Sequence, residues 1–271
     1  MAKKKYLVID VALCHDCNNC FIACKDEHVM NSWLPYIDEQ PRHGHRWMNI
    51  ERTERGQYPR VSANFLPKPC QHCAEPKCKE AFDESVTVRE DGIVLIDAEK
   101  AKGNKELLDS CPYDAIWYNE EKGVPQKCTF CAHILDGQAG ASICSTRCAH
   151  SCPTEAITYH DLDEAEFEKL KAAEGLERYK PEESPDGLVW YKNLYRFTKH
   201  FIAGGFLKDG ECAEGVKVTL KGVDVPEQTT NYFGDFWFDG LAPGAYTIVA
   251  DGQDIMDVTL TESVNVGNIA L

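Results

Sequence analysis

The chain lacks any long apolar run. Nowhere in its 271 residues is there a stretch that approaches the ~20 apolar residues needed to span a membrane. Near the N-terminus, Lys3, Lys4 and Lys5 precede a short strand pattern at 6–10, with no twin arginine and no apolar h-region, so no export signal is expected. We therefore expect a cytoplasmic protein without a membrane partner, although a folded subunit can also be exported with a partner that carries the signal.

Positive charge is scarce as well. The chain has 29 Lys and Arg against 44 Asp and Glu, a formal net charge of −15. This balance disfavours nucleic acid and anionic membrane surfaces as partners. Residues 42–60 have the opposite charge balance, with five arginines and two glutamates. A solvated face and a docking face for a partner subunit both remain open for this basic stretch.

Cysteine, in contrast, is abundant, and almost all of the 14 cysteines fall in three bursts. The first burst is Cys14-His-Asp-Cys17-Asn-Asn-Cys20-Phe-Ile-Ala-Cys24, a C-x2-C-x2-C-x3-C run. Three such thiolates can surround one [4Fe–4S] cubane, while the fourth reaches a different cluster. Structural zinc prefers separated C-x2-C pairs, and disulfide frameworks belong to small secreted domains. The run therefore predicts iron–sulfur clusters and an electron-transfer protein.

Missing cysteines are as informative as those present. The pattern C-P-x-x-A-I at Cys111 and Cys152 is typical of the end of a ferredoxin half-module, and the second burst, Cys70 to Cys78, is spaced C-x2-C-x4-C. Ferredoxin spacing calls for four more cysteines around this burst, at positions that carry Phe82, Ala101, Asn104 and Leu107. Under cross-ligation these four would hold one cluster. The sequence thus predicts that one cluster site is deleted and its neighbour is kept.

The remaining cysteines form three complete ligand sets. Site 1 consists of Cys14, Cys17, Cys20 and Cys152; site 2 of Cys24, Cys128, Cys131 and Cys148; and site 3 of Cys70, Cys73, Cys78 and Cys111. The frame is ambiguous, because Cys144-x3-Cys148 has the same spacing as Cys148-x3-Cys152, and Pro153 favours the latter. Cys144 and Cys212 are then surplus, either as buried or free thiols or as spare ligands.

Three histidines lie next to the cysteines. His72 is inside the second burst, and His133 and His150 each follow a cysteine in a C-x-H pattern. A Rieske centre needs two histidines on one iron, and only half of its pattern is present. We therefore expect these imidazoles to hydrogen-bond to cluster sulfur rather than to bind iron.

The rest of the chain suggests a division into parts. Alternation around Asp91-Gly92 predicts a hairpin, and residues 161–174 read as an amphipathic helix that ends at Gly175. From about 197 onward the sequence consists of short alternating strands in an acidic background. We predict an α+β chain with a tandem ferredoxin-like [4Fe–4S] domain (1–160, with an insertion at 25–69), a helix and aromatic linker (161–196), and a C-terminal all-β sandwich of transthyretin or Cna-B type (197–271).

The ferredoxin-type part resembles the four-cluster iron–sulfur subunits of the dimethyl sulfoxide reductase family of molybdopterin enzymes. Within that family, the chain is similar to three-cluster small subunits of enzymes that hydroxylate or transhydroxylate phenolic rings. Beyond the first burst, the motifs that carry this similarity are residues 44–52, 89–97, 191–197, 214–220 and 233–238. Cys144 is a departure from the shared ligand set.

The resemblance implies a subunit without catalytic residues. Such a chain docks on a large catalytic subunit, which holds molybdenum bound by two molybdopterin guanine dinucleotides. In the four-cluster relatives, site 1 lies nearest the molybdenum, site 2 is central and site 3 is distal, and the site deleted here is the terminal one. This implies a two-subunit enzyme that keeps its electrons or passes them to a soluble acceptor. The alternatives are a subunit of another oxidoreductase of the family and a stand-alone polyferredoxin carrier.

Overall fold

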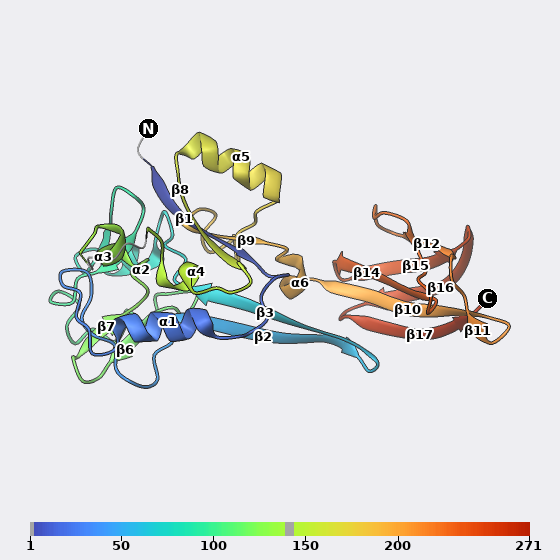
Figure 1. The fold of residues 1–271 in the computed structure, drawn as a ribbon, viewed down its shortest axis with the longest axis horizontal. Helices are drawn as coiled ribbons and strands as arrows, with labels where there is room; N and C mark the ends of the chain where they lie inside the picture. The colour runs from blue at the N-terminus through green and yellow to red at the C-terminus, as the bar shows by residue number, and fades with distance from the viewer. Residues whose placement is uncertain (1–2, 139–143) are drawn as a thin grey trace. The chain divides into compact units, whose positions relative to one another are not determined.

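The computed structural model describes residues 3–138 and 144–271 and divides the chain into two compact units (Figure 1). The first unit contains Met1–Glu51 and Phe65–Leu194, and the second contains Arg52–Asn64 and Tyr195–Leu271. A segment of the insertion therefore belongs with the C-terminal strands. No helix in the described part of the chain combines the length and the apolar character needed to cross a membrane.

A three-stranded sheet underlies the first unit. Its central strand β1 (Lys4–Asp10) is antiparallel to β8 (Ile157–Leu162) and parallel to β9 (Val189–Lys192). Residues 6–9 of β1 are all buried, as expected for a strand with neighbours on both edges and cover on its faces. The ring of Tyr6 stacks on Phe167 at a centroid distance of 3.6 Å. This contact places helix α5 (Glu164–Glu174) against the sheet (Figure 1).

Helix α5 confirms the predicted amphipathic helix but starts later than expected. Asp161 and Leu162 pair with β1 as part of β8, so the helix begins at Glu164. Asp163 caps it, and its carboxylate accepts a hydrogen bond from the Glu166 backbone N–H in a capping box. At the other end Gly175 has φ of 61°, a conformation that favours glycine, and the helix stops there as predicted.

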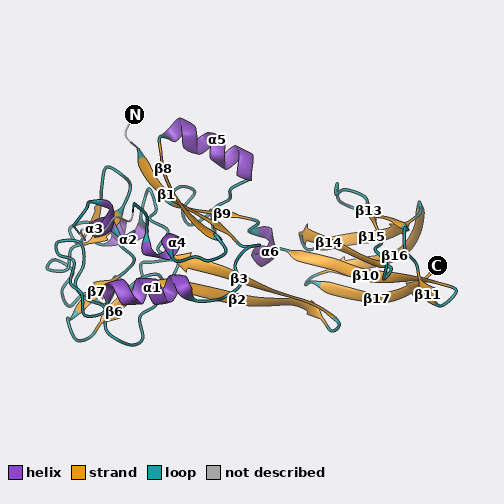
Figure 2. Ribbon diagram, in the orientation of Figure 1, coloured by secondary structure: helices purple, strands orange, loops and turns teal. Residues whose placement is uncertain are grey.

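Short elements surround the cysteine bursts (Figure 2). The predicted hairpin around Asp91-Gly92 is confirmed, with β4 (Val86–Val88) antiparallel to β5 (Val94–Ile96). A second hairpin pairs β6 (Trp117–Asn119) with β7 (Val124–Gln126). The helices of this region are α1 (Asn19–His28), α2 (Lys77–Ala81), α3 (Ala132–Leu135) and α4 (Arg147–His150).

The insertion is built around a long hairpin of β2 (Met48–Gln57) and β3 (Arg60–Pro69). Its tip carries two of the five arginines of the basic stretch. In the second unit, Arg55 donates to both carboxylate oxygens of Asp239 at 2.8 and 3.0 Å, and Arg60 pairs with Asp235. In the first unit, the Arg46 guanidinium lies 3.9 Å over the Phe21 ring. Three of these arginines therefore have partners within this chain, which weakens the docking interpretation.

The second unit is rich in strands, as predicted for the C-terminal region, and its two four-stranded sheets share one hydrophobic core. One sheet contains β10 (His200–Lys208), β11 (Glu211–Cys212), β14 (Asp235–Leu241) and β17 (Val264–Ala270). The other contains β12 (Lys217–Lys221), β13 (Gln228–Thr229), β15 (Gly244–Ala250) and β16 (Gln253–Leu260). A short helix, α6 (Tyr195–Thr198), precedes them.

Strand β10 pairs with β11, β14 and β17. It carries Gly204-Gly205, and glycine weakens a strand pattern. The structure shows the reason for the first glycine: a Cβ at Gly204 would lie 2.6 Å from Val266 and 2.7 Å from Phe236. The glycine thus allows neighbouring side chains to approach the backbone closely in the middle of the sheet.

Candidate iron–sulfur sites

The same backbone turn recurs in the cysteine loops. In each of three C-x2-C loops the residue before the second cysteine has a positive φ: 55° at Asp16, 44° at His72 and 57° at Phe130. The fourth residue of each C-P-x-x-A-I segment does the same, with 52° at Asp114 and 55° at Glu155. Residues other than glycine visit this region rarely. Because this conformation recurs at equivalent positions, the cysteine loops share one type of tight turn.

The four cysteines of site 3 line one cavity. Cys78 comes from helix α2, Cys111 from the segment after Leu107, and Cys70 and Cys73 from the loop after β3. Burial raises the pKa of Cys78 to about 12 and that of Cys111 to about 11, and neighbouring thiolates add to both shifts. Thiols in this setting stay protonated unless a metal group replaces the protons.

The four cysteines of site 2 line a second cavity. Burial raises the pKa of Cys128 to about 12. Donors already approach the sulfurs: the Phe130 N–H lies 3.3 Å from Cys128 Sγ and the Arg147 N–H 3.4 Å from Cys131 Sγ. Hydrogen bonds of this kind stabilise thiolate ligands and help to set cluster potentials.

Site 1 is less enclosed. Cys20, the buried member, has its pKa raised to about 12 by burial, with the thiolates of Cys148, Cys14 and Cys152 contributing. Cys17 is exposed on the loop before α1. The structure thus brings Cys14, Cys20 and Cys152 together from opposite ends of the cysteine-rich region, with Cys17 at the surface.

The three sites form a row. Cys148 of site 2 lies close enough to Cys20 of site 1 for their charges to interact. On the other side, the charge of Cys70 of site 3 acts on Cys128 of site 2. Site 2 is therefore the middle member of the row.

The four positions without cysteine lie beside site 3. Ala101 and Leu107 are completely buried and belong to a hydrophobic cluster with Cys78, against which Phe82 packs. Asn104 donates its backbone N–H to the Ala101 carbonyl at 3.0 Å. Apolar side chains therefore occupy the neighbourhood in which a fourth ligand set would gather.

Two cysteines lie outside these sets. Cys144 is exposed and lines neither cavity, whereas Cys148 is buried and lines that of site 2. Cys212 is exposed on β11 in the second unit. This placement matches the frame that Pro153 favours.

The three histidines differ in their surroundings. His72 Nδ1 accepts the Val94 N–H at 3.0 Å, so Nε2 carries the proton, and this buried N–H has no partner among the described residues. Burial lowers the pKa of His72 far below its usual value and keeps the ring neutral. His133 is fully buried, and its Nε2 lies 3.0 Å from Glu27. His150 is exposed at the end of α4.

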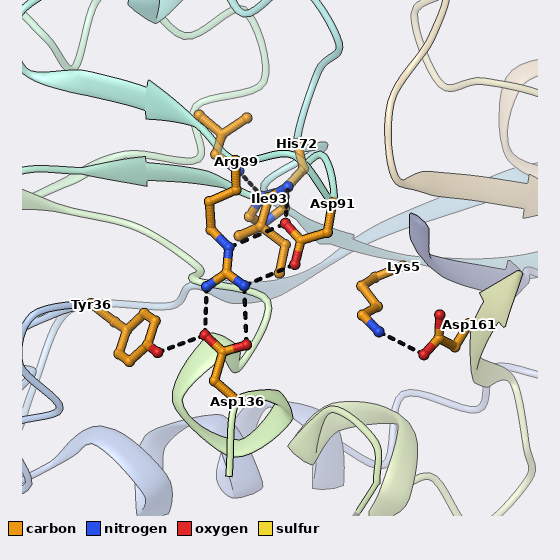
Figure 3. A network of polar contacts seen from close by, with 9 residues as sticks. Lys5, Tyr36, His72, Arg89, Asp91, Ile93, Asp136 and Asp161 are labelled. Atoms are coloured by element: carbon orange, nitrogen blue, oxygen red, sulfur yellow. Dashed lines mark hydrogen bonds and ion pairs between the residues drawn. The ribbon is translucent and has the colours of Figure 1, made fainter. Parts of the chain in front are cut away.

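Sequence analysis did not identify a polar network that connects residues near the second and third cysteine bursts with the insertion (Figure 3). Arg89, after β4, donates to both carboxylate oxygens of Asp136 at 2.7 and 3.0 Å and also contacts Asp91. Tyr36, from the insertion, donates to Asp136 at 2.6 Å. The hydrogen bonds from Arg89 hold the pKa of Asp136 below its usual value. The network ties the second burst, the third burst and the insertion together, and no local sequence signal marks it.

The chemistry of the donors suits clusters. Each predicted set consists of four cysteines, the number of thiolates that holds a [4Fe–4S] cluster. Zinc requires its thiolates about 2.3 Å from a single point, whereas the cysteines of a cubane bind different irons. Thiols around a cavity, N–H donors to sulfur and an orphaned His72 N–H together fit [4Fe–4S] groups.

Comparison with known proteins agrees with this chemistry. The family model of the 4Fe-4S dicluster domain matches residues 61–162. The chain is 49% identical to the pyrogallol hydroxytransferase small subunit of Pelobacter acidigallici, over 98% of both chains. It is 29% identical to the thiosulfate reductase electron transfer subunit of Salmonella typhi, over 69% of this chain and 88% of that one. The respiratory nitrate reductase 1 beta chain of Escherichia coli is 32% identical over 44% of this chain and 23% of its own length.

Proposed function

The chain belongs to the family of iron–sulfur small subunits that includes the pyrogallol hydroxytransferase small subunit, and on this premise we propose that it carries electrons for a molybdopterin enzyme acting on phenolic rings. The proposed reaction is hydroxylation or transhydroxylation of the pyrogallol, phloroglucinol or resorcinol type. The catalytic centre, molybdenum with two molybdopterin guanine dinucleotides, belongs to a large partner subunit. This chain supplies no catalytic residue.

The observation that carries the proposal is the row of three thiol sets. Site 1 would hold one [4Fe–4S] cluster through Cys14, Cys17, Cys20 and Cys152. Sites 2 and 3 would each hold another, through the cysteines that line their cavities. Each cluster, when bound, accepts and returns one electron. Two cysteines of site 2, Cys131 and Cys148, and two of site 3, Cys70 and Cys78, are buried, which limits the access of water to these sites.

The replacement of a fourth ligand set by other residues supports a count of three iron–sulfur clusters on this chain. Phe82, Ala101 and Leu107 pack against Cys78 as a hydrophobic cluster. A fourth cluster would require four cysteines from this same neighbourhood. In the proposed order, site 1 faces the catalytic subunit, site 2 is central and site 3 is distal, which agrees with the middle position of site 2. A soluble acceptor in the cytoplasm is the proposed exit for electrons when the reaction needs one.

The second unit has a supporting role in this proposal. We propose a cluster-binding domain at 1–160, a helix and linker at 161–196 and a sandwich of transthyretin or Cna-B type at 197–271 that stabilises the complex. The shared core of the two sheets supports a sandwich.

Two measurements test the function. Purification through a tag on this chain should yield a larger chain that contains molybdenum, whereas isolation of the chain alone would support the stand-alone carrier. Turnover of a dihydroxybenzene is then assayed with and without an electron acceptor. Hydroxylation by water releases two electrons and stops without an acceptor, whereas transfer of a hydroxyl group between rings has no net redox change and continues.

A further inference from the structure

Lys127 is a buried lysine between two of the proposed cluster sites. It is only 2% exposed, lines the cavity of site 3, and directly precedes Cys128 of site 2. Its ammonium group donates to the backbone carbonyls of Val94 and, at 3.1 Å, of Cys128. These two contacts fix the side chain in the wall between the sites.

The charge of Lys127 has no carboxylate partner within residues 3–138 and 144–271. In this part of the chain its ammonium forms hydrogen bonds to backbone carbonyls but no ion pair. An unpaired buried charge is costly, and buried cations are normally paired with anions. The other buried lysine of this unit, Lys68, follows that rule and pairs with Glu51. The anions that remain for Lys127 are the thiolates of sites 2 and 3.

The position of Lys127 agrees with this interpretation. Its side chain lines the site 3 cavity together with the four cysteines of that site. Its ammonium also contacts the carbonyl of Cys128, a ligand of site 2. One cation thus lies beside ligands of both sites.

We propose that Lys127 is a positioning residue for electron transfer, whose buried positive charge stabilises the reduced state of the clusters at site 3 and, to a lesser extent, site 2. The proposal rests on the proposed function, because it requires clusters at these sites. Adding an electron makes a thiolate-bound cluster more negative, so a fixed neighbouring cation favours reduction and raises the midpoint potential. Burial makes the effect strong, because solvent does not screen the charge.

The test is a potentiometric titration of the purified complex, followed by EPR, for the wild type and five variants. Lys127→Met removes the charge at similar volume, Lys127→Gln removes the charge but keeps a donor, and Lys127→Arg keeps the charge. Lys77→Met is the matched control, since Lys77 lines the same site 3 cavity but is exposed and pairs with Glu183. The signal that a Cys78→Ala variant lacks identifies the site 3 cluster.

We expect Lys127→Met and Lys127→Gln to lower the reduced-to-oxidised ratio of the site 3 cluster about tenfold at fixed potential, which is about 59 mV for one electron. Lys127→Arg should stay near the wild type, and Lys77→Met should shift far less. Unchanged potentials in the Met and Gln variants, or an equal shift in the Lys77 variant, would overturn the proposal. Iron content is measured first in every sample. A wild-type complex without the site 3 signal would contradict the proposed function instead.

If the Lys127→Met variant does not assemble into the complex, the Lys127→Gln variant alone shows whether the potential of the site 3 cluster shifts. If both neutral variants lose iron only from site 3 while Lys127→Arg keeps it, the charge requirement stands. If the Arg variant loses iron as well, the residue acts through its shape and the electrostatic proposal is wrong.

Discussion

Replacing Cys78 by alanine should remove one cluster and spare the other two. Cys78 is 9% exposed, lines the site 3 cavity and does not line that of site 2. Three clusters correspond to about twelve irons per chain, so loss of site 3 leaves about eight. The visible cluster absorbance should fall by about a third for the same reason.

The size of the loss follows from the packing around Cys78. Without this ligand, the cavity of site 3 keeps only three thiols, and the iron–sulfur cluster has no fourth anchor. Sites 1 and 2 share no ligand with site 3, so their cysteines stay in place. Local packing changes little. Cys78 contributes only one sulfur to the group of buried apolar side chains that includes Val86 and Leu107, and the other contacts in that group remain.

The assay is iron analysis per mole of chain together with EPR of the reduced protein. The control is Cys212→Ala, which removes an exposed thiol from the second unit and should leave iron at the wild-type level. If Cys78→Ala retains all its iron, the ligand set of site 3 is wrong. If it loses all of its iron, the three sites do not assemble independently.

Three further predictions concern the two units. Deleting residues after about 200 should weaken assembly or solubility but leave the cluster spectra largely intact; spectra that collapse would show that the units fold as one. Phe206→Ala empties a fully buried position of the second core and should lower the free energy of unfolding of that unit by about 3–5 kcal/mol in urea titrations; a loss below 1 kcal/mol would contradict this core. Hydrogen bonds from Arg89 keep the folded-state pKa of Asp136 below its unfolded value near 4. The contribution of Asp136 to the free energy of unfolding is therefore complete above that unfolded value and is lost as the pH falls through the folded-state pKa. Asp136→Asn should therefore flatten the acid side of the stability curve, and an unchanged acid limb would argue against the network.

Short-range patterns predicted most of what is local. The Asp91-Gly92 hairpin and the Gly175 helix end each depend on a few adjacent residues, and both are present in the structure. The start of α5 could not be placed, because Asp161 and Leu162 are drawn into β8 by pairing with β1, a partner more than 150 residues away. Tertiary pairing decided between strand and helix there.

The cysteine spacing likewise predicts which thiols form each ligand set, but it does not predict what surrounds them. The exposure of Cys144 and the burial of Cys148 agree with the frame that Pro153 favours. In contrast, the ion pair of Arg89 with Asp136 joins residues 47 positions apart, and nothing near either residue predicts it. Lys127 stands next to Cys128, but only the fold shows that it is buried and that it has no carboxylate partner among the residues that the structure describes.

The most direct test of the central claim is the number of clusters on this chain. Iron and protein are quantified in the purified complex, and the reducible centres are counted by spin-quantified EPR. The account predicts about twelve irons and three [4Fe–4S] centres for each copy of this chain. Iron near sixteen with a fourth reducible centre would contradict the replacement of a cluster site by Phe82, Ala101, Asn104 and Leu107, and iron near eight would contradict one of the three ligand sets.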